Sequence, residues 1–341
     1  MTTHPSSTPL LKVDNLAVDF STDKGVARAI NGISFEVMPG ETLAIVGESG
    51  CGKSVSSLAV MGLIPSPPGR IAEGSIKFQG KELVGLSHKA YRQIRGNEIS
   101  MIFQEPMTAL NPVLKVSTQM IDVIRNHTQC SKREALNKAI EMLEIVGIPS
   151  PEKRVHVYPH ELSGGMRQRV MIAMALSCGP KLLLADEPTT ALDVTIQAQV
   201  MRELVRLKKE LEMAVVLVTH DLGVVAESCQ RVVVMYCGEI IEQGRVDEIF
   251  SNPQHPYTQG LLASIPVVRD KKIARLPTIE GVVPDLFSLP KGCRFSTRCP
   301  KATSKCHESA PRLKEVSDDG VPSTAPLGHQ AACFYAEEVN A

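Results

Sequence analysis

The stretch that decides the fold is Gly47-Glu48-Ser49-Gly50-Cys51-Gly52-Lys53-Ser54. It fits the pattern G-x-x-x-x-G-K-[ST], in which the glycines let backbone N–H groups turn around a chain of phosphates. A short apolar run at residues 42–46 predicts a buried strand that enters this loop, and a helix is expected to begin at Lys53. Such a loop predicts a nucleotide site where the Lys53 ammonium reaches the β- and γ-phosphates and the Ser54 hydroxyl binds Mg²⁺.

A second stretch supplies the acids that a nucleoside triphosphatase needs. Residues 182–187, Leu-Leu-Leu-Ala-Asp-Glu, predict a buried strand that ends in two carboxylates. Asp186 at the strand end would hold Mg²⁺, and Glu187, one residue further, would accept a proton from an attacking water as general base. Predicted helix 196–211 and predicted strand 215–219 follow, and this alternation indicates a largely parallel sheet covered on both faces.

Between residues 47 and 220 the remaining motifs have the order and spacing of ABC-transporter ATPases, which this chain resembles. Residues 162–169, Leu-Ser-Gly-Gly-Met-Arg-Gln-Arg, resemble the signature motif, with Met166 where Gln is more usual. Gln104 resembles the residue that names the Q-loop, Ala191-Leu192-Asp193 resembles the D-loop, and His220 resembles the switch histidine.

The resemblance implies a role for each of these positions. Catalysis would rest on Glu187, His220 and Gln104, with His220 at the γ-phosphate, and Mg²⁺ would be bound by Ser54, Gln104 and Asp186. Cys51 lies within the loop, and its side chain is expected to have no chemical role. Phe20 would stack on adenine, or is a plain core residue. The full expected ATP-binding set is Phe20, Gly47, Glu48, Ser49, Gly50, Cys51, Gly52, Lys53, Ser54, Gln104, Ser163, Gly164, Gly165, Asp186 and Asp193.

Three further stretches resemble one branch of the family, the ATPases of peptide and nickel importers. They are residues 101–112, in which Glu105 stands where Asp is commoner, 158–175 and 252–258. The resemblance implies an ATPase that powers import of dipeptides or oligopeptides from the cytoplasmic face of the inner membrane, as a peripheral protein. Its expected partners are a second ATPase, identical or homologous, in a head-to-tail dimer, two transmembrane permease subunits and an extracytoplasmic peptide-binding protein. Import of nickel or another solute, an exporter subunit and a non-transport ABC ATPase remain alternatives.

The composition agrees with this interpretation. The 341 residues suggest two or three domains, and 37 Lys and Arg against 37 Asp and Glu argue against a nucleic-acid partner. The sequence contains no run of 18 apolar residues, so no membrane span is predicted. The polar N-terminus does not resemble a secretory signal. A cytosolic chain with reduced thiols is therefore expected. The aromatic fraction of 4% predicts an aliphatic core.

Four of the nine cysteines, Cys293, Cys299, Cys306 and Cys333, fall in the last 52 residues, where Pro and Gly are frequent and apolar periodicity fades. A metal would hold together a segment that lacks a core of its own. The spacing suits neither a zinc ribbon nor a ferredoxin, so [4Fe–4S], Zn²⁺ and unligated thiols remain open. The resemblance to peptide importers favours the [4Fe–4S] cluster.

We therefore expect an α/β protein with a P-loop NTPase core of the RecA-like ABC type. The core would comprise residues 1–109 and 178–250. Residues 110–177 would form a helical subdomain that contains the signature motif. Residues 251–341 would form a small loop-rich C-terminal extension that contains the four cysteines.

Overall fold

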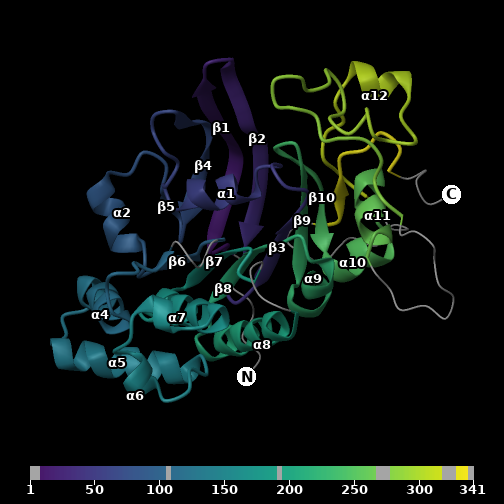
Figure 1. Cartoon of the computed structure of the whole chain (residues 1–341). Helices are drawn as coiled ribbons and strands as arrows, with labels where there is room; N and C mark the ends of the chain where they lie inside the picture. Colours follow the sequence, from purple (N-terminus) through teal and green to yellow (C-terminus); the bar gives the residue numbers. More distant parts are fainter. Residues whose placement is uncertain (1–7, 105–108, 190–193, 266–276, 317–327, 337–341) are drawn as a thin grey trace, which may run out of the picture. The chain divides into compact units, whose positions relative to one another are not determined.

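The structure is a computed structural model that describes residues 8–104, 109–189, 194–265, 277–316 and 328–336 (Figure 1). Its elements, in chain order, are β1 (Leu11–Thr22), β2 (Gly25–Val37), β3 (Thr42–Val46), α1 (Lys53–Val60), β4 (Gly69–Phe78), β5 (Lys81–Glu82), α2 (His88–Ile94), β6 (Ile99–Ile102), α4 (Val116–His127), α5 (Lys132–Ile145), α6 (Pro151–Arg154), the 3₁₀ turn η1 (Pro159–Glu161), α7 (Gly164–Leu176), β7 (Leu182–Asp186), α8 (Val194–Glu210), β8 (Ala214–Val218), α9 (Leu222–Ser228), β9 (Arg231–Tyr236), β10 (Glu239–Arg245), α10 (Val246–Ser251), α11 (Pro256–Ala263), α12 (Ser304–Glu308), β11 (Lys314–Glu315) and β12 (Gln330–Ala331).

The chain forms two compact units, each made of segments far apart in the sequence. The first contains residues 1–11, 37–41 and 78–218, and the second contains residues 12–36, 42–77 and 219–341. The phosphate loop belongs to the second unit, whereas the acidic strand and the signature motif belong to the first.

Parallel strands form the centre of the first unit. β7 lies between β6 and β8 and is parallel to both, with Leu184 opposite Met101 on one side and Val216 on the other. Every residue of the three strands is buried, which explains why their sequences are continuous apolar runs rather than alternating patterns. Helices α4, α5 and α7 pack against one another in the same unit.

Helix α5 begins with a reciprocal pair of hydrogen bonds. The Ser131 hydroxyl accepts a hydrogen bond from the N–H of Glu134 at 3.2 Å, and the Glu134 carboxylate accepts one from the N–H of Ser131 at 2.7 Å. This reciprocal pair is a capping box, and it satisfies two N–H groups that no helical carbonyl can reach.

The second unit joins the strand before the phosphate loop to the C-terminal part of the chain. β3 runs parallel to β9, β9 and β10 are antiparallel, and β12 adds to β10 with Ala331 opposite Glu242. Two residues of β11 then pair with β12. The loop-rich C-terminal segment is therefore anchored by backbone hydrogen bonds to the strands that carry the phosphate loop.

An aromatic cluster fills the space between these strands and the C-terminal segment. The rings of Tyr236, Tyr257 and Phe295 have centroids 4.8 to 5.4 Å apart, and all three side chains are buried. The prediction of an aliphatic core is therefore wrong at this place, where Phe295 of the loop-rich segment packs against Tyr236 of β9 and Tyr257 of α11.

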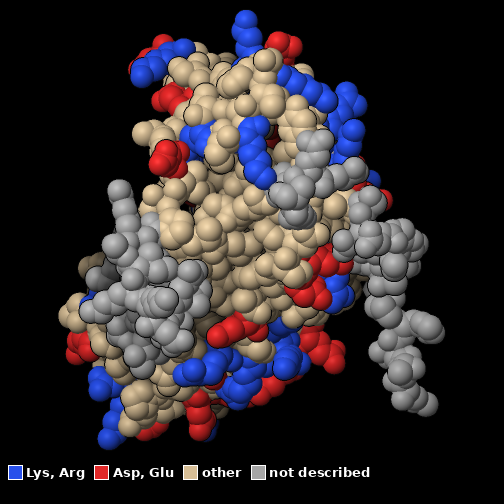
Figure 2. All heavy atoms as spheres, turned by 90° about the vertical axis from the view of Figure 1, so that its right-hand side faces the viewer, with Lys and Arg blue, Asp and Glu red and all other residues tan. Residues whose placement is uncertain are grey.

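No helix among the described residues is long and apolar enough to cross a membrane. Figure 2 shows one face of the molecule, on which Lys and Arg side chains are interspersed with Asp and Glu.

Candidate functional site

The phosphate loop joins β3 to α1, as predicted, and its path depends on glycine. Gly47 and Gly52 have φ angles of 150° and 100°, which L side chains rarely adopt. A Cβ on Gly47 would lie 2.3 Å from the carbonyl oxygen of Met235, closer than any real contact. The backbone of the loop therefore passes directly against β9, and no other residue type fits at Gly47.

Lys53, the first residue of α1, points back into the loop. Its Nζ donates hydrogen bonds to the carbonyl oxygens of Gly47 at 2.8 Å and Glu48 at 3.0 Å, and only 6% of the residue is exposed. Ser54 follows in the first turn of the helix and is half-buried. The loop thus brings an ammonium group, a hydroxyl group and a helix N-terminus together, which is the chemistry that binds phosphate groups and Mg²⁺.

Glu48 in the loop is held by two residues that the sequence did not single out. The Glu48 N–H donates a hydrogen bond to the Tyr257 hydroxyl at 2.8 Å, and the Glu48 carboxylate forms an ion pair with Arg298 at 2.6 Å. Tyr257 lies within the predicted importer motif 252–258, and Arg298 precedes Cys299, yet no spacing rule relates either residue to a loop more than 200 positions away.

The other predicted residues of this unit have different environments. Phe20, near the end of β1, is half-buried and its ring lies against Gly69 of β4. His220, two residues after β8, is exposed. Cys51 is 1% exposed, and burial raises the pKa of its thiol, so it stays protonated at neutral pH, in keeping with the absence of an expected role.

The first unit brings the predicted general base and the predicted Q-loop residue together. Asp186 ends β7 and is 4% exposed. Glu187 follows with a φ of 45°, and its N–H donates to the Val218 carbonyl at 2.9 Å. Gln104, beyond the end of β6, donates from Nε2 to Glu187 Oε2 at 3.1 Å. A non-glycine residue in the left-handed region is strained, and such strain is concentrated at functional positions.

The signature motif begins helix α7. Ser163 is the N-cap, and its hydroxyl accepts a hydrogen bond from the Met166 N–H at 3.3 Å, while Gly164 and Gly165 form the first turn. Gln168 in the same helix is 1% exposed and donates to the carbonyl oxygen of Pro188, which follows Glu187. The helix N-terminus is a suitable site for an anion, and Gln168 ties its helix to the segment that carries Glu187.

The predicted D-loop residue Asp193 and its neighbours Ala191 and Leu192 lie outside the described residues, as does Glu105.

The four C-terminal cysteines line one pocket of the second unit, together with side chains that include His255, Phe295 and Tyr335. The pKa of the Cys293 thiol is raised to about 11, chiefly by burial and to a smaller extent by the other three cysteines. All four are free thiols. The tertiary fold therefore gathers residues that the sequence spaces up to 40 positions apart.

The metal prediction for these cysteines is not supported. No group of three or more His, Cys, Asp or Glu side chains within the described ranges is arranged to hold a metal ion. The donor set has the chemistry of a thiolate site, in which Cys306 is buried and Cys293, Cys299 and Cys333 are half-buried around the pocket.

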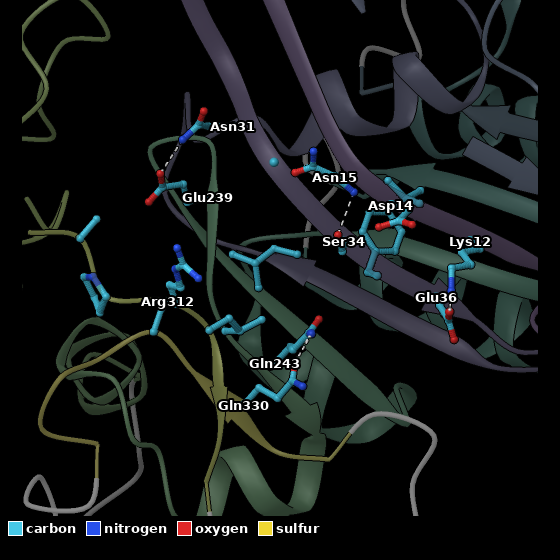
Figure 3. Close-up of a pocket in the computed structure, with 18 residues that line it drawn as sticks. Lys12, Asp14, Asn15, Asn31, Ser34, Glu36, Glu239, Gln243, Arg312 and Gln330 are labelled. Atoms are coloured by element: carbon cyan, nitrogen blue, oxygen red, sulfur yellow. Dashed lines mark hydrogen bonds and ion pairs between the residues drawn. The ribbon is translucent and has the colours of Figure 1, made fainter. Parts of the chain in front are cut away.

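A larger cavity of about 630 Å³ lies elsewhere in the second unit, between β1, β2, β10 and the C-terminal segment (Figure 3). Polar and apolar side chains both line it, and several of the polar ones pair with one another, such as Lys12 with Glu36 at 2.7 Å and Gln243 with Gln330 at 2.7 Å. Among the predicted ATP-site residues that the structure describes and the C-terminal cysteines, none lines this cavity.

A glycine-built loop between a buried strand and a helix, together with a parallel strand that ends in Asp186 and Glu187, defines a P-loop nucleoside triphosphatase. The family model "ABC transporter" matches residues 30–190, and the model "Oligopeptide/dipeptide transporter, C-terminal region" matches residues 241–306. The chain belongs to the ABC-transporter ATPase family, as the motifs predicted.

Similar proteins extend over nearly the whole chain. It is 51% identical to the oligopeptide transport ATP-binding protein AppD of Bacillus subtilis, over 97% of this chain and 98% of that protein. It is 50% identical to the dipeptide transport ATP-binding protein DppD of Haemophilus influenzae, over 94% and 97%. The dimeric, post-hydrolysis structure of the ATP-binding cassette MJ0796 with ADP and Pi matches at a TM-score of 0.63 and 27% identity, over 69% of this chain and 98% of that one. The predicted fold class is confirmed.

Proposed function

We propose that this chain is the ATPase subunit that powers import of dipeptides or oligopeptides. One observation carries the proposal: a complete ABC ATPase motif set is followed in the same chain by a C-terminal region of the oligopeptide/dipeptide transporter type at residues 241–306. Relatives named for oligopeptide and dipeptide transport match 97% and 94% of this chain.

The phosphate loop supplies nucleotide binding in this proposal. Residues Gly47, Glu48, Ser49, Gly50, Cys51 and Gly52 form the loop, Lys53 binds the β- and γ-phosphates, and Ser54 binds Mg²⁺ through its hydroxyl. The buried ammonium of Lys53 and the glycine-dependent backbone support this assignment. Phe20 stacks on adenine.

The acidic strand supplies the chemistry. Asp186 binds Mg²⁺, and Glu187 accepts the proton of the attacking water while Gln104 orients the carboxylate and contacts Mg²⁺. The 3.1 Å hydrogen bond between Gln104 and Glu187 supports this pairing. Bound Mg²⁺ would neutralise the charge that develops on the phosphate oxygens, and carboxylate, hydroxyl and amide oxygens are the donors it prefers.

A second ATPase subunit completes each site. Ser163, Gly164 and Gly165 bind the phosphates of the ATP held by the partner subunit, His220 contacts the γ-phosphate, and Asp193 acts at the interface. The helix N-terminus at Ser163 supports an anion-binding role. The ATPase dimer is head-to-tail, with an identical or a homologous second subunit.

The remaining partners follow from the proposed transport function. Two transmembrane permease subunits hold the ATPase dimer at the cytoplasmic face of the inner membrane, and an extracytoplasmic binding protein delivers the peptide. We also propose the division into a core of residues 1–109 and 178–250, a helical subdomain of 110–177 and an extension of 251–341.

The C-terminal cysteines carry a separate proposal, a [4Fe–4S] cluster or, as the alternative, Zn²⁺, bound by Cys293, Cys299, Cys306 and Cys333. Their placement around one pocket supports it. Iron, acid-labile sulfide and zinc are measured in anaerobically purified protein. About four irons and four sulfides per chain are expected for the cluster. One zinc per chain would support the alternative. Protein that contains neither iron nor zinc would refute both proposals.

The transport proposal is tested with the chain expressed beside its permease subunits. Mg²⁺-dependent ATP hydrolysis and uptake of a labelled dipeptide are both expected, and Lys53→Ala should abolish both. If ATP hydrolysis drives uptake of nickel but not of peptide, the proposed transport substrate is wrong and the ATPase assignment stands. A parent protein that does not hydrolyse ATP would refute the proposal.

A further inference from the structure

Arg298 forms a two-point ion pair with a residue of the phosphate loop. Its Nη1 lies 2.6 Å from Glu48 Oε2, and its Nη2 lies 3.1 Å from Glu48 Oε1. Only 3% of the Arg298 side chain is exposed, and 30% of that of Glu48. The fork geometry matches a carboxylate in both position and plane, so this pair is directional as well as charged.

The guanidinium group is itself fixed by its own segment. Its Nε donates to the carbonyl oxygen of Glu280 at 3.0 Å, and Nη2 donates to that of Ile279 at 3.3 Å. The group also lies over the rings of Tyr236 at 5.9 Å and Phe295 at 6.0 Å. The hydrogen bond that Arg298 donates to Glu48 raises the pKa of Arg298, so the guanidinium stays charged. Arg298 is therefore a rigid cationic support and not a mobile surface side chain.

Every polar group of Glu48 is engaged by a named partner. The N–H donates to the Tyr257 hydroxyl at 2.8 Å, the carbonyl oxygen accepts from Lys53 at 3.0 Å, and the carboxylate pairs with Arg298. Two of these three partners come from the C-terminal part of the chain. The position of the loop is thus set from outside the loop.

The charge of Glu48 gives this arrangement a consequence for ligand binding. A carboxylate in a loop that binds a triphosphate repels its ligand, and partial burial weakens the screening by water and salt. Paired with Arg298, the carboxylate is neutralised. Without Arg298, a largely buried negative charge would remain within the phosphate loop.

We propose that Arg298 is a positioning residue of the ATP site, which neutralises and orients Glu48 so that the phosphate loop binds a triphosphate only when the C-terminal segment is in place. The inference rests on the proposed ATP-binding function. It assigns the C-terminal segment a direct role in nucleotide binding, in addition to any role in holding a metal.

The test measures the Kd of the full-length chain for ATP with Mg²⁺ at low ionic strength. Arg298→Gln is expected to weaken ATP binding about tenfold, because the negative charge of Glu48 is no longer neutralised. The double variant Arg298→Gln with Glu48→Gln is expected to recover to within about threefold of the parent, because the repulsion is gone. In 0.5 M KCl the defect of the single variant should shrink, since salt screens charge and does not repair packing. Arg312→Ala removes one exposed cation from the same segment and serves as the control, with an unchanged Kd expected.

Other results would contradict either the role of Arg298 or the proposed ATP-binding function. A single variant within twofold of the parent, or a double variant as weak as the single one, overturns the inference, because the ion pair then has no electrostatic effect on binding. Thermal unfolding confirms that each variant is folded. If Arg298→Gln does not fold, the double variant decides, since it leaves no unpaired charge. A parent that binds no ATP, or a Lys53→Ala variant that binds like the parent, refutes the proposed function instead.

Discussion

Replacing Glu187 by Gln isolates the proton-accepting role of one carboxylate. The substitution exchanges one oxygen for an NH₂ group and keeps the volume of the side chain. Gln and Glu have similar backbone preferences, so the φ of 45° should be retained. The 3.1 Å contact with Gln104 at the surface changes from an ionic to a neutral hydrogen bond. We therefore expect the free energy of unfolding to change by less than about 1 kcal/mol.

The loss of activity should be far larger. A positioned general base contributes about 10²- to 10⁴-fold to the rate, and an amide cannot accept the proton of the attacking water. At about 1.4 kcal/mol for each factor of ten, this raises the barrier by roughly 3 to 6 kcal/mol. Binding of ATP should be unchanged, because the phosphate loop is intact in the variant, and the ATP-bound dimer should accumulate.

Two measurements check this expectation. Phosphate release at saturating ATP with Mg²⁺ reports hydrolysis, and the elution volume of the variant in size-exclusion chromatography with ATP reports the dimer. Gln104→Ala is the matched control, because it removes the other partner of the same hydrogen bond and keeps the base, so a smaller loss is expected. Hydrolysis by Glu187→Gln within threefold of the parent would show that another group accepts the proton. A parallel loss of ATP binding would show that the carboxylate acts in binding instead.

Three further outcomes follow from the second unit. Gly47→Ala places a Cβ 2.3 Å from the Met235 carbonyl oxygen, and it should abolish detectable ATP binding and lower the thermal unfolding temperature. Tyr257→Phe leaves the N–H of Glu48 without its acceptor, and urea unfolding should report a loss of about 1 to 3 kcal/mol. Burial lowers the pKa of His255 to about 4, so the unfolded chain, with a pKa near 6.5, binds the proton first. Stability should therefore fall by about 3 kcal/mol as the pH drops from 6.5 through 4, and His255→Gln should flatten this dependence.

The ATP-site motifs were predictable because their chemistry depends on local geometry. The turn at Gly47 requires glycine, the strand before Asp186 must be apolar on both faces, and Ser163 caps the helix that follows it, so each requirement appears as residue types at short fixed spacing. The capping box at Ser131 likewise depends on two residues only three positions apart.

The C-terminal segment was predictable only in outline. Its low apolar periodicity correctly indicated a loop-rich region, but the buried rings of Tyr257 and Phe295 were not expected from an aromatic fraction of 4%. Four cysteines around one pocket agree with their clustering in the sequence, yet their spacing contained no information on whether a metal binds there.

The sequence alone determined the P-loop ATPase class, the positions of the phosphate-loop and acidic motifs, and the resemblance to peptide importers, since each depends on neighbours within a few positions. Only the tertiary structure decided that Glu48 meets Arg298, 250 positions away, and that Tyr257 holds the same residue. The physical reason is the pairing of strands. The parallel contact of β3 with β9, the hairpin of β9 with β10 and the addition of β12 bring the C-terminal segment to the phosphate loop, and the period of a strand does not encode which strand lies beside it.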